Sequence, residues 1–151
     1  MKKAQAGMDF LMTYGWALLI VVIVVGALFG LGIFDEGTFV GNKASGFTSI
    51  GVSGWQLKTD GKLSLKLRNN AATDIQITLI NATYGNESKT YTSTISLGNG
   101  KETTVTDAVT FTSAPSSGQA YNIQIDIKYT DTKSGFTYMD RGTITGKAVP
   151  A

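Results

Sequence analysis

The chain contains no cysteine and no histidine among its 151 residues, and only two prolines. Without cysteine it cannot form disulfides, and without either residue it lacks the thiolate and imidazole ligands of most zinc, haem and iron–sulfur sites. The absence of histidine also removes the side chain most often used as a general base near neutral pH. We therefore expect no disulfides, no metal and no cofactor.

Charge is also scarce, because 16% of the residues are charged and the formal net charge is +2. Lys2 and Lys3 supply two of the 13 basic residues, so the rest of the chain has as many basic as acidic residues, 11 of each. Proteins that bind nucleic acids concentrate basic residues on one surface, so we expect no nucleic-acid partner. The length suits one domain with an appendage and is too short for a two-domain enzyme.

One long apolar segment, Phe10 to Phe34, carries no charge and is flanked by Asp9 and Asp35. As a helix it would extend roughly 37 Å, which exceeds the hydrocarbon core of a bilayer, about 30 Å thick. Such a helix would be apolar on every side from Leu18 to Val25, so lipid or protein must surround it. We expect this helix to occupy residues 5–36 and to span a membrane or enter the core of an assembly.

The basic residues around this segment predict its orientation. Lys2 and Lys3 precede it, and no basic residue follows until Lys43. The positive-inside rule then places the N-terminus in the cytoplasm and the rest of the chain outside. The segment is longer than the apolar part of a secretory signal peptide, and Gly30 to Asp35 offers no clear cleavage site. We therefore expect the segment to remain in the mature protein.

After a linker predicted at residues 37–46, the apolar pattern changes to a period of two. Strict alternation of apolar and polar residues predicts strands with one buried face. Stretches rich in threonine, valine and aromatic residues predict additional strands. The alternating strands are Leu63–Leu67, Ile75–Leu79 and Ile123–Tyr129, and the additional ones are Ile50–Lys58, Thr90–Leu97, Thr103–Phe111 and Phe136–Thr145.

Turn residues separate these strands. Asp60-Gly61 and Gly98-Asn99-Gly100 are both hairpin signals. Seven or so short strands without a second helical pattern indicate an antiparallel sandwich of the immunoglobulin class. The predicted fold is thus α+β, with a hydrophobic helix followed by an extracellular β-sandwich head at residues 47–151.

The start of the apolar segment resembles a known signal. Residues 2–10 read KKAQAGMDF, which resembles the class III signal peptide of archaeal type IV pilin-like proteins. That signal reads glutamine, any residue, serine, any residue, glutamate and phenylalanine ahead of a hydrophobic helix. Gln5, Asp9 and Phe10 stand at the family's positions, Gly7 replaces the serine and the acidic residue is aspartate. The run from Met8 to Ala17 is also similar to such precursors.

The resemblance implies a sequence of processing and assembly. A membrane prepilin peptidase would cut between Ala4 and Gln5 on the cytoplasmic side and release the leader, residues 1–4. The helix would then form the core of a filament, with a cytoplasmic assembly ATPase and a membrane platform protein as partners. A cut after Gly7 is a second conceivable site, but it would leave Asp9 only one residue into the mature chain.

Cleavage would remove two charges that are costly in a dry helical core. It would also create an ammonium group at Gln5, which could pair with Asp9 of the same or a neighbouring subunit and set the axial register. Phe10, next to Asp9, is included in this predicted assembly site. The alternative is that Asp9 is an interfacial polar residue, or an acidic residue in the first turn favoured by the helix dipole.

Glycines in the second half of the segment have two interpretations. Gly26 and Gly30 form a small-xxx-small pattern, which permits close approach of helices, although glycine is common in membrane helices in any case. Gly30 and Gly32 could instead loosen the helix as a hinge near its outer end.

Two sequons predict N-linked glycans on the head. Asn81-Ala82-Thr83 and Asn86-Glu87-Ser88 both fall in or beside the turn expected after Ile75–Ile80. In a chain rich in serine and threonine one or both sequons could be accidental. If they are used, sugar would coat the outer surface, and the threonine-rich strands could carry O-linked sugar as well.

No catalytic arrangement is recognisable in the head. The acidic residues show no calcium-loop spacing, and no glycine-rich phosphate loop follows a strand. Aromatic residues could stack on a glycan, but in a sandwich they more often belong to the core or to cross-strand pairs. We expect core positions or cross-strand pairs for Trp55, Tyr84, Tyr91, Tyr121, Tyr129, Phe136 and Tyr138.

The leading hypothesis is a non-enzymatic structural subunit, a pilin of an archaeal type IV pilus-like surface filament. Its helices would form the core and its β domains an outer surface for adhesion. The precursor would be anchored in the membrane and the mature protein would be extracellular. The alternative is a monomeric, signal-anchored surface binding protein, and self-association of the helix separates the two. A subunit of an archaellum, a rotating filament, is a related hypothesis, but the leader resembles the leaders of that class less.

Overall fold

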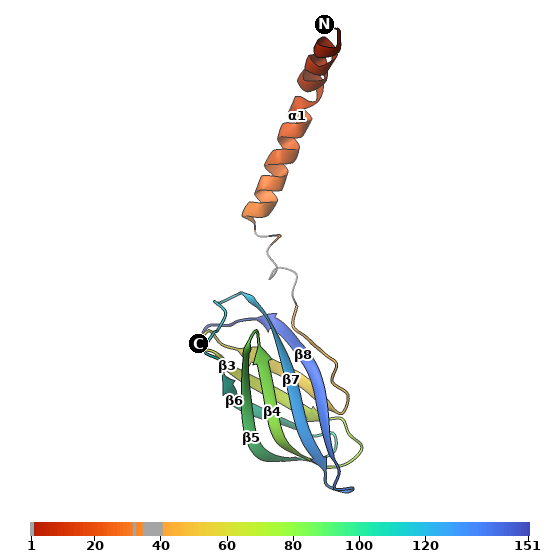
Figure 1. Cartoon of the computed structure of the whole chain (residues 1–151), viewed down its shortest axis with the longest axis vertical. Helices are drawn as coiled ribbons and strands as arrows, with labels where there is room; N and C mark the ends of the chain where they lie inside the picture. Colours follow the sequence, from red (N-terminus) through yellow and green to blue (C-terminus); the bar gives the residue numbers. More distant parts are fainter. Residues whose placement is uncertain (1, 32, 35–40) are drawn as a thin grey trace. The chain divides into compact units, whose positions relative to one another are not determined.

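The computed structural model describes residues 2–31, 33, 34 and 41–151 of the chain. They divide into two compact units, Met1–Phe39 and Val40–Ala151. The described residues of the first unit form one helix, α1 (Lys2–Gly30), and those of the second form eight strands (Figure 1). The predicted α+β class is confirmed at this level, a long apolar helix followed by antiparallel sheets.

The ends of α1 differ from the predicted range 5–36. The helix already includes Lys2–Ala4 of the predicted leader, where lysine and alanine favour helix and no breaker intervenes. It ends at Gly30. Gly32 of the predicted hinge, residues 35–36 of the predicted helix and residues 37–40 of the predicted linker lie outside the described residues.

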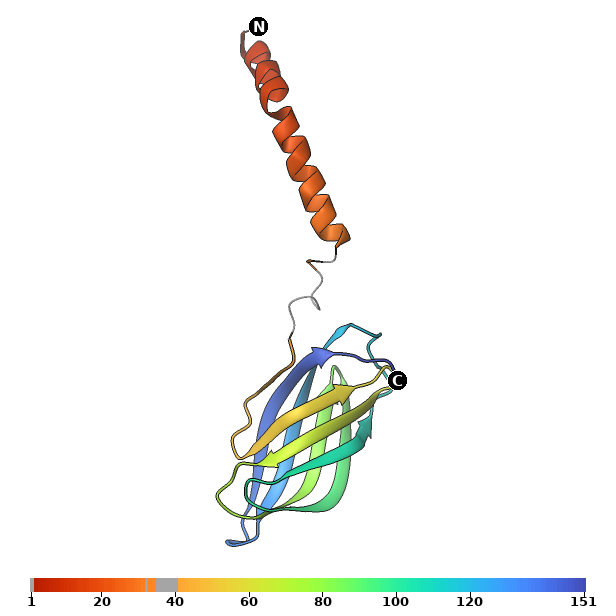
Figure 2. The same cartoon turned by 180° about the vertical axis from the view of Figure 1, so that it is seen from behind.

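The strands form two antiparallel sheets. The five-stranded sheet has the order β1-β8-β7-β4-β5, and the three-stranded sheet has the order β2-β3-β6. Figure 2 shows the three-stranded sheet in front of the five-stranded sheet. The bounds are β1 Lys43–Ser45, β2 Ile50–Leu57, β3 Lys62–Asn69, β4 Ile75–Tyr84, β5 Glu87–Leu97, β6 Glu102–Thr110, β7 Ala120–Asp131 and β8 Thr137–Lys147.

Both sheets face a single hydrophobic core, as the alternation of apolar residues predicts. Every strand predicted from the sequence is present, with shifts of a few residues at the ends. The fully buried side chains include Leu63, Leu65 and Leu67 of β3, Ile75, Ile77 and Ile80 of β4, and Ile123, Ile125 and Ile127 of β7.

The two predicted hairpin signals have different outcomes. Asp60-Gly61 joins β2 to β3, which pair with each other, so this prediction is confirmed. Gly98-Asn99-Gly100 does not form a hairpin, because β5 and β6 belong to different sheets. The turn carries the chain from one sheet to the other, and the main-chain N–H of Gly100 donates to the carbonyl oxygen of Asn69 at 2.9 Å. The residue types of a turn favour a reversal of the chain but do not specify which sheet the next strand joins.

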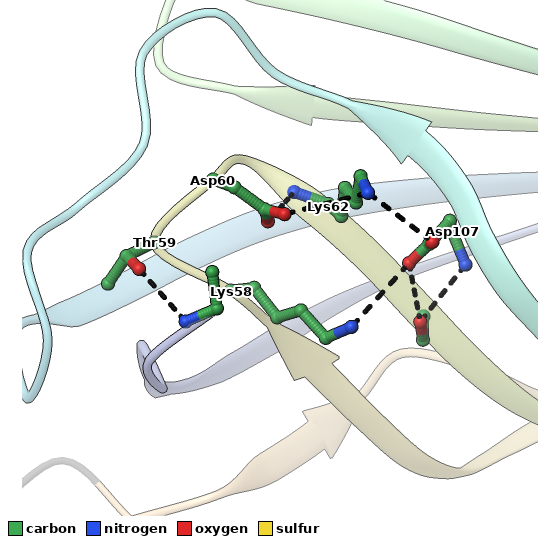
Figure 3. A network of polar contacts seen from close by, with 7 residues as sticks. Lys58, Thr59, Asp60, Lys62 and Asp107 are labelled. Carbon is green, nitrogen blue, oxygen red and sulfur yellow. Dashed lines mark hydrogen bonds and ion pairs between the residues drawn. The ribbon is translucent and has the colours of Figure 1, made fainter.

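A polar network surrounds the β2–β3 turn (Figure 3). The Oδ1 of Asp60 accepts a hydrogen bond from the main-chain N–H of Lys62 at 3.2 Å. Asp107 on β6 lies within ion-pair distance of Lys58 at 4.0 Å and of Lys62 at 3.9 Å. Asp107 has a φ of 49° at a register shift between β3 and β6, as residues in β-bulges often do. The network therefore links the turn to the edge of its own sheet.

Part of the predicted linker is a strand. Within residues 37–46, β1 (Lys43–Ser45) pairs with β8 from Thr145 to Thr143. Three residues with one apolar side chain give no detectable period of two, so sequence reasoning assigned them to the linker. The predicted boundary of the head at residue 47 is therefore too late, because the head's sheet already includes β1. We call residues 41–50, which contain β1 and continue to β2, the anchor strap.

A buried carboxylate fixes the end of the anchor strap. Asp140 on β8 is 4% exposed. Its Oδ2 accepts hydrogen bonds from the main-chain N–H groups of Thr48 at 3.0 Å and of Ser49 and Ile50 at 2.8 Å. Its Oδ1 accepts a further bond from the Thr48 hydroxyl at 3.1 Å. The carboxylate thus serves as the acceptor for the main-chain N–H groups of three consecutive residues at the end of the strap.

Candidate assembly helix and glycosylation hairpin

α1 is apolar on all sides from Leu18 to Val25. It is long and apolar enough to cross a membrane, with a mean hydropathy of 2.4, and none of that stretch is buried. The exposed large side chains of α1 run from 41% exposed at Val25 to 80% at Met12, and Leu28 is less exposed than these. Water does not tolerate a continuous apolar surface of this kind, so α1 requires lipid or other protein around it.

Three of the polar residues of α1, all in its first half, lie on one side of the helix. Gln5, Asp9 and Thr13 follow one another at intervals of four residues, which places them above one another on a helix. The Thr13 hydroxyl donates to the carbonyl oxygen of Asp9 at 2.8 Å, so it is satisfied within its own helix. The Asp9 side chain is exposed.

The other predicted assembly residues are spread along α1. Phe10 packs against Tyr14, one helical turn further along α1, with their tilted rings 4.9 Å apart between centroids. Gly26 and Gly30 are exposed, and a Cβ built on either meets nothing within 4 Å. Both positions are open to a neighbouring helix. Their roles in assembly stay predictions, as does cleavage between Ala4 and Gln5.

The second candidate site is the hairpin between β4 and β5. Tyr84 pairs with Glu87, so Gly85 and Asn86 form a two-residue turn. Gly85 has a φ of 59°. Two-residue hairpin turns need a positive φ at this position, and glycine adopts it most easily. Asn86 is exposed at the turn, which is the position where an oligosaccharide meets least steric hindrance.

Asn81 is not in a turn, contrary to the expectation that both sequons flank one. β4 continues past Ile80 to Tyr84, so Asn81 lies within the strand and pairs with Thr90 of β5 and Asp126 of β7. Its Oδ1 accepts hydrogen bonds from the hydroxyls of Ser88 at 2.9 Å and Thr90 at 3.2 Å. Alternation continues through this stretch because Ala82 is small and buried, a signal that sequence reasoning passed over. Glycosylation at either asparagine stays a prediction.

Glu87, the middle residue of the second sequon, ties the hairpin to the loop after β6. Its carboxylate accepts hydrogen bonds from the main-chain N–H of Thr112 at 2.8 Å and of Ser113 at 3.2 Å. It also forms an ion pair with Lys89 at 3.1 Å. The bond from Thr112 is the main cause that lowers the pKa of the Glu87 carboxyl from 4.5 to about 2, and Ser113 and Lys89 lower it further.

The lowered pKa predicts an acid-dependent loss of stability. Because the folded-state value lies below the unfolded value, the stabilisation by Glu87 is fully present above pH 4.5 and is lost as the pH falls toward 2. We expect Glu87→Gln to be less stable than wild type at pH 6 and the difference to shrink progressively below pH 4.5. Urea unfolding of both proteins between pH 6 and 2 measures it, and a difference independent of pH would contradict the prediction.

One aromatic residue departs from the expected core or paired position. Phe136 is 66% exposed, because it precedes β8 in the tip between β7 and β8 and is not within a sheet. Tyr138 forms a cross-strand pair with Tyr129, their ring centroids 5.7 Å apart, as expected. Of the others, Tyr121 and Tyr129 are buried, and Trp55, Tyr84 and Tyr91 pack against the core.

The described part of the chain contains no group of three acidic side chains placed to hold a metal ion. An open hollow of about 210 Å³ lies on the three-stranded sheet. Gly54 and Gln56 from β2, Ser64 and Lys66 from β3 and Thr104 from β6 contribute to its wall. The Ser64 hydroxyl accepts a hydrogen bond from the main-chain N–H of Asp107 at 3.0 Å and donates to the Oδ1 of the same residue at 3.5 Å.

Comparison with known proteins adds no relative. No protein-family model matches the chain, and no curated protein matches it significantly.

Proposed function

We propose that the protein is the structural subunit of an archaeal type IV pilus-like surface filament, with α1 in the filament core and the head on the outside. The observation that carries the proposal is the long apolar stretch of α1, none of which is buried among the described residues. Burying a Leu, Ile, Val or Phe side chain contributes about 1.5–3 kcal/mol. A helix with so many exposed side chains of this kind needs a permanent apolar environment, which a bundle of identical helices supplies.

The polar line on α1 supports registered assembly over a plain membrane anchor. An anchor needs only apolar length, whereas the exposed Asp9 lies one helical turn after Gln5, the residue at which we expect the mature helix to begin. A buried carboxylate without a partner is strongly unfavourable. Cleavage after Ala4 creates an ammonium group at Gln5 on the same helical face, and this group is the partner we propose for Asp9 in the assembled core.

The head supports a surface location. Its two antiparallel sheets around one core are compatible with an immunoglobulin-like sandwich, which we propose as its class. The sequon at Asn86 lies at an exposed turn, where a glycan would cover the outer surface. We further propose adhesion as the role of the head, prepilin peptidase, an assembly ATPase and a platform protein as partners, and a precursor whose N-terminus is cytoplasmic.

The experiment that tests the proposal combines N-terminal sequencing with electron microscopy of surface material from cells that make the protein. We expect the mature chain to begin at Gln5 and to occur in filaments. Asp9→Ala should still be processed but should abolish filaments, because the ammonium group loses its partner. Asp9→Glu, which keeps the charge, is the matched control and should retain them.

Two outcomes would contradict the proposal. An intact N-terminus at Met1 on a protein that never forms filaments would identify a monomeric signal-anchored surface protein instead. Normal filaments from Asp9→Ala would show that Asp9 has no role in assembly and would contradict that part of the proposal alone.

A further inference from the structure

The anchor strap follows β8 lengthwise. The Thr145 hydroxyl lies 3.3 Å from the carbonyl oxygens of both Gly41 and Lys43. Backbone pairing then continues to Ser45 opposite Thr143, and the Asp140 carboxylate receives the last residues of the strap. The beginning of the strap therefore lies beside the end of β8, and the strap runs antiparallel to it.

β8 is shaped to receive the strap. A Cβ placed on Gly142 would lie 2.5 Å from the ring of Phe47, so the glycine leaves the space that the ring fills. Gly46 has a φ of 89°, and a Cβ there would lie 3.2 Å from the carbonyl oxygen of Arg141. The side chain of Trp55 on β2 donates to the carbonyl oxygen of Thr145 at 3.1 Å, which joins the other sheet to the same end of β8.

The direction of these strands determines how they bear load. The chain connects α1 to the start of the strap, whereas the tip between β7 and β8 lies at the opposite end of β8. Tension between Gly41 and that tip pulls two antiparallel strands by opposite ends, so it loads all their hydrogen bonds together in shear. Tension applied at one shared end would instead break the bonds one after another.

We propose that the anchor strap and β8 form a mechanical clamp, which holds the head folded when tension reaches it through α1. This inference rests on the proposed function, because only an anchored or filament-bound head experiences such tension. Asp140 acts as the lock at the far end of the strap, since releasing the strap requires its three backbone hydrogen bonds to break with the β1–β8 pairing.

Single-molecule force spectroscopy on the full chain in detergent tests the clamp. Attachment points introduced as azide-bearing residues at Gly41 and Ser134 load the strap in shear, and points at Gly41 and Ala151 load it from the shared end. All three positions are exposed. We expect a roughly twofold higher rupture force in the first geometry at equal loading rate. Equal forces in both geometries would overturn the proposal.

A reversible cross-link provides the second measurement. Ser45→Cys with Thr143→Cys joins paired residues of the strap and β8, and the absence of native cysteine makes the disulfide unambiguous. Oxidation should raise the rupture force in the shear geometry, and reduction should restore it. Thr130→Cys with Thr137→Cys, a pair at the far end of β8, is the matched control and should leave the force unchanged.

A rupture force that oxidation of the Ser45–Thr143 pair does not change would show that the strap bears no load. Because these measurements use single molecules, they do not depend on filament formation. Failure of the clamp would leave the filament proposal intact, and absence of filaments would leave the clamp intact.

Discussion

Replacement of Asp140 by asparagine is expected to lower the free energy of unfolding by about 3 kcal/mol. The carboxylate is buried and accepts hydrogen bonds from three main-chain N–H groups and from the Thr48 hydroxyl. Asparagine has nearly the same shape, but one of its two acceptors becomes an NH₂ group that faces donors. The variant therefore replaces charge-assisted bonds with weaker neutral ones and places an NH₂ group beside the main-chain N–H and the hydroxyl of Thr48.

Asp126→Asn is the matched control for this substitution. Asp126 forms an ion pair with Arg141 at 2.6 Å, but the Arg141 side chain is 65% exposed. Exposed ion pairs contribute little, so we expect a loss of less than about 1 kcal/mol. Urea unfolding of the full chain in detergent, followed by tryptophan fluorescence, measures both variants. Equal losses from the two substitutions would show that Asp140 does not fix the strap.

Gly61→Ala should destabilise the head by about 3 kcal/mol. Gly61 has a φ of 85°, which disfavours every residue with a Cβ. In addition, an alanine Cβ would lie 2.1 Å from the carbonyl oxygen of Phe111, which belongs to the backbone and cannot rotate away. The main-chain N–H of Phe111 donates to the Gly61 carbonyl at 2.9 Å, so the clash also disturbs that bond.

Gly85→Ala separates the two causes. Gly85 also has a positive φ, of 59°, but a Cβ there meets nothing within 4 Å. It should lose only about 1 kcal/mol, the cost of the left-handed conformation alone. Thermal unfolding by circular dichroism compares the two variants. If Gly61→Ala proves no less stable than Gly85→Ala, the close approach of Phe111 is not a constraint in solution.

Periodicity predicts much of the fold, because burial of one face imposes a period of two on each strand. Leu63–Leu67 and Ile123–Tyr129 were recognisable for that reason. β1 was not, because three residues are too short to show a period and its place depends on pairing with a strand far along the chain. The turn at Gly98–Gly100 was assigned to a hairpin because local residue types do not reveal long-range topology.

The buried polar residues were equally out of reach of sequence reasoning. Asn69 is completely buried and its Nδ2 donates to the carbonyl oxygens of Thr73 at 2.8 Å and Leu97 at 3.0 Å. Asp140 has the same character, and the sequence analysis assigned a structural role to neither residue. Their partners lie on other elements, so only the three-dimensional structure reveals that they are structural.

The candidate site was predicted unevenly. The apolar helix is evident from composition alone, and Gln5, Asp9 and Phe10 were placed by resemblance to a signal. The sequence also located both sequons, but the length of β4 decides that Asn86 is at a turn and Asn81 is within a strand. The extent of a strand depends on its neighbours in the sheet, and the local signal after Ile80, the alternation that continues at Ala82, is too short to define it.

The ion pair between Glu87 and Lys89 has a consequence for crowded heads. Both residues lie on the inward face of β5, since Lys89 pairs with buried Ala82 and Glu87 pairs with Tyr84. β5 is the last strand of its sheet, and a foreign strand added there would have to cover these charges. These charges therefore disfavour edge-to-edge pairing of β5 with a strand of a second molecule.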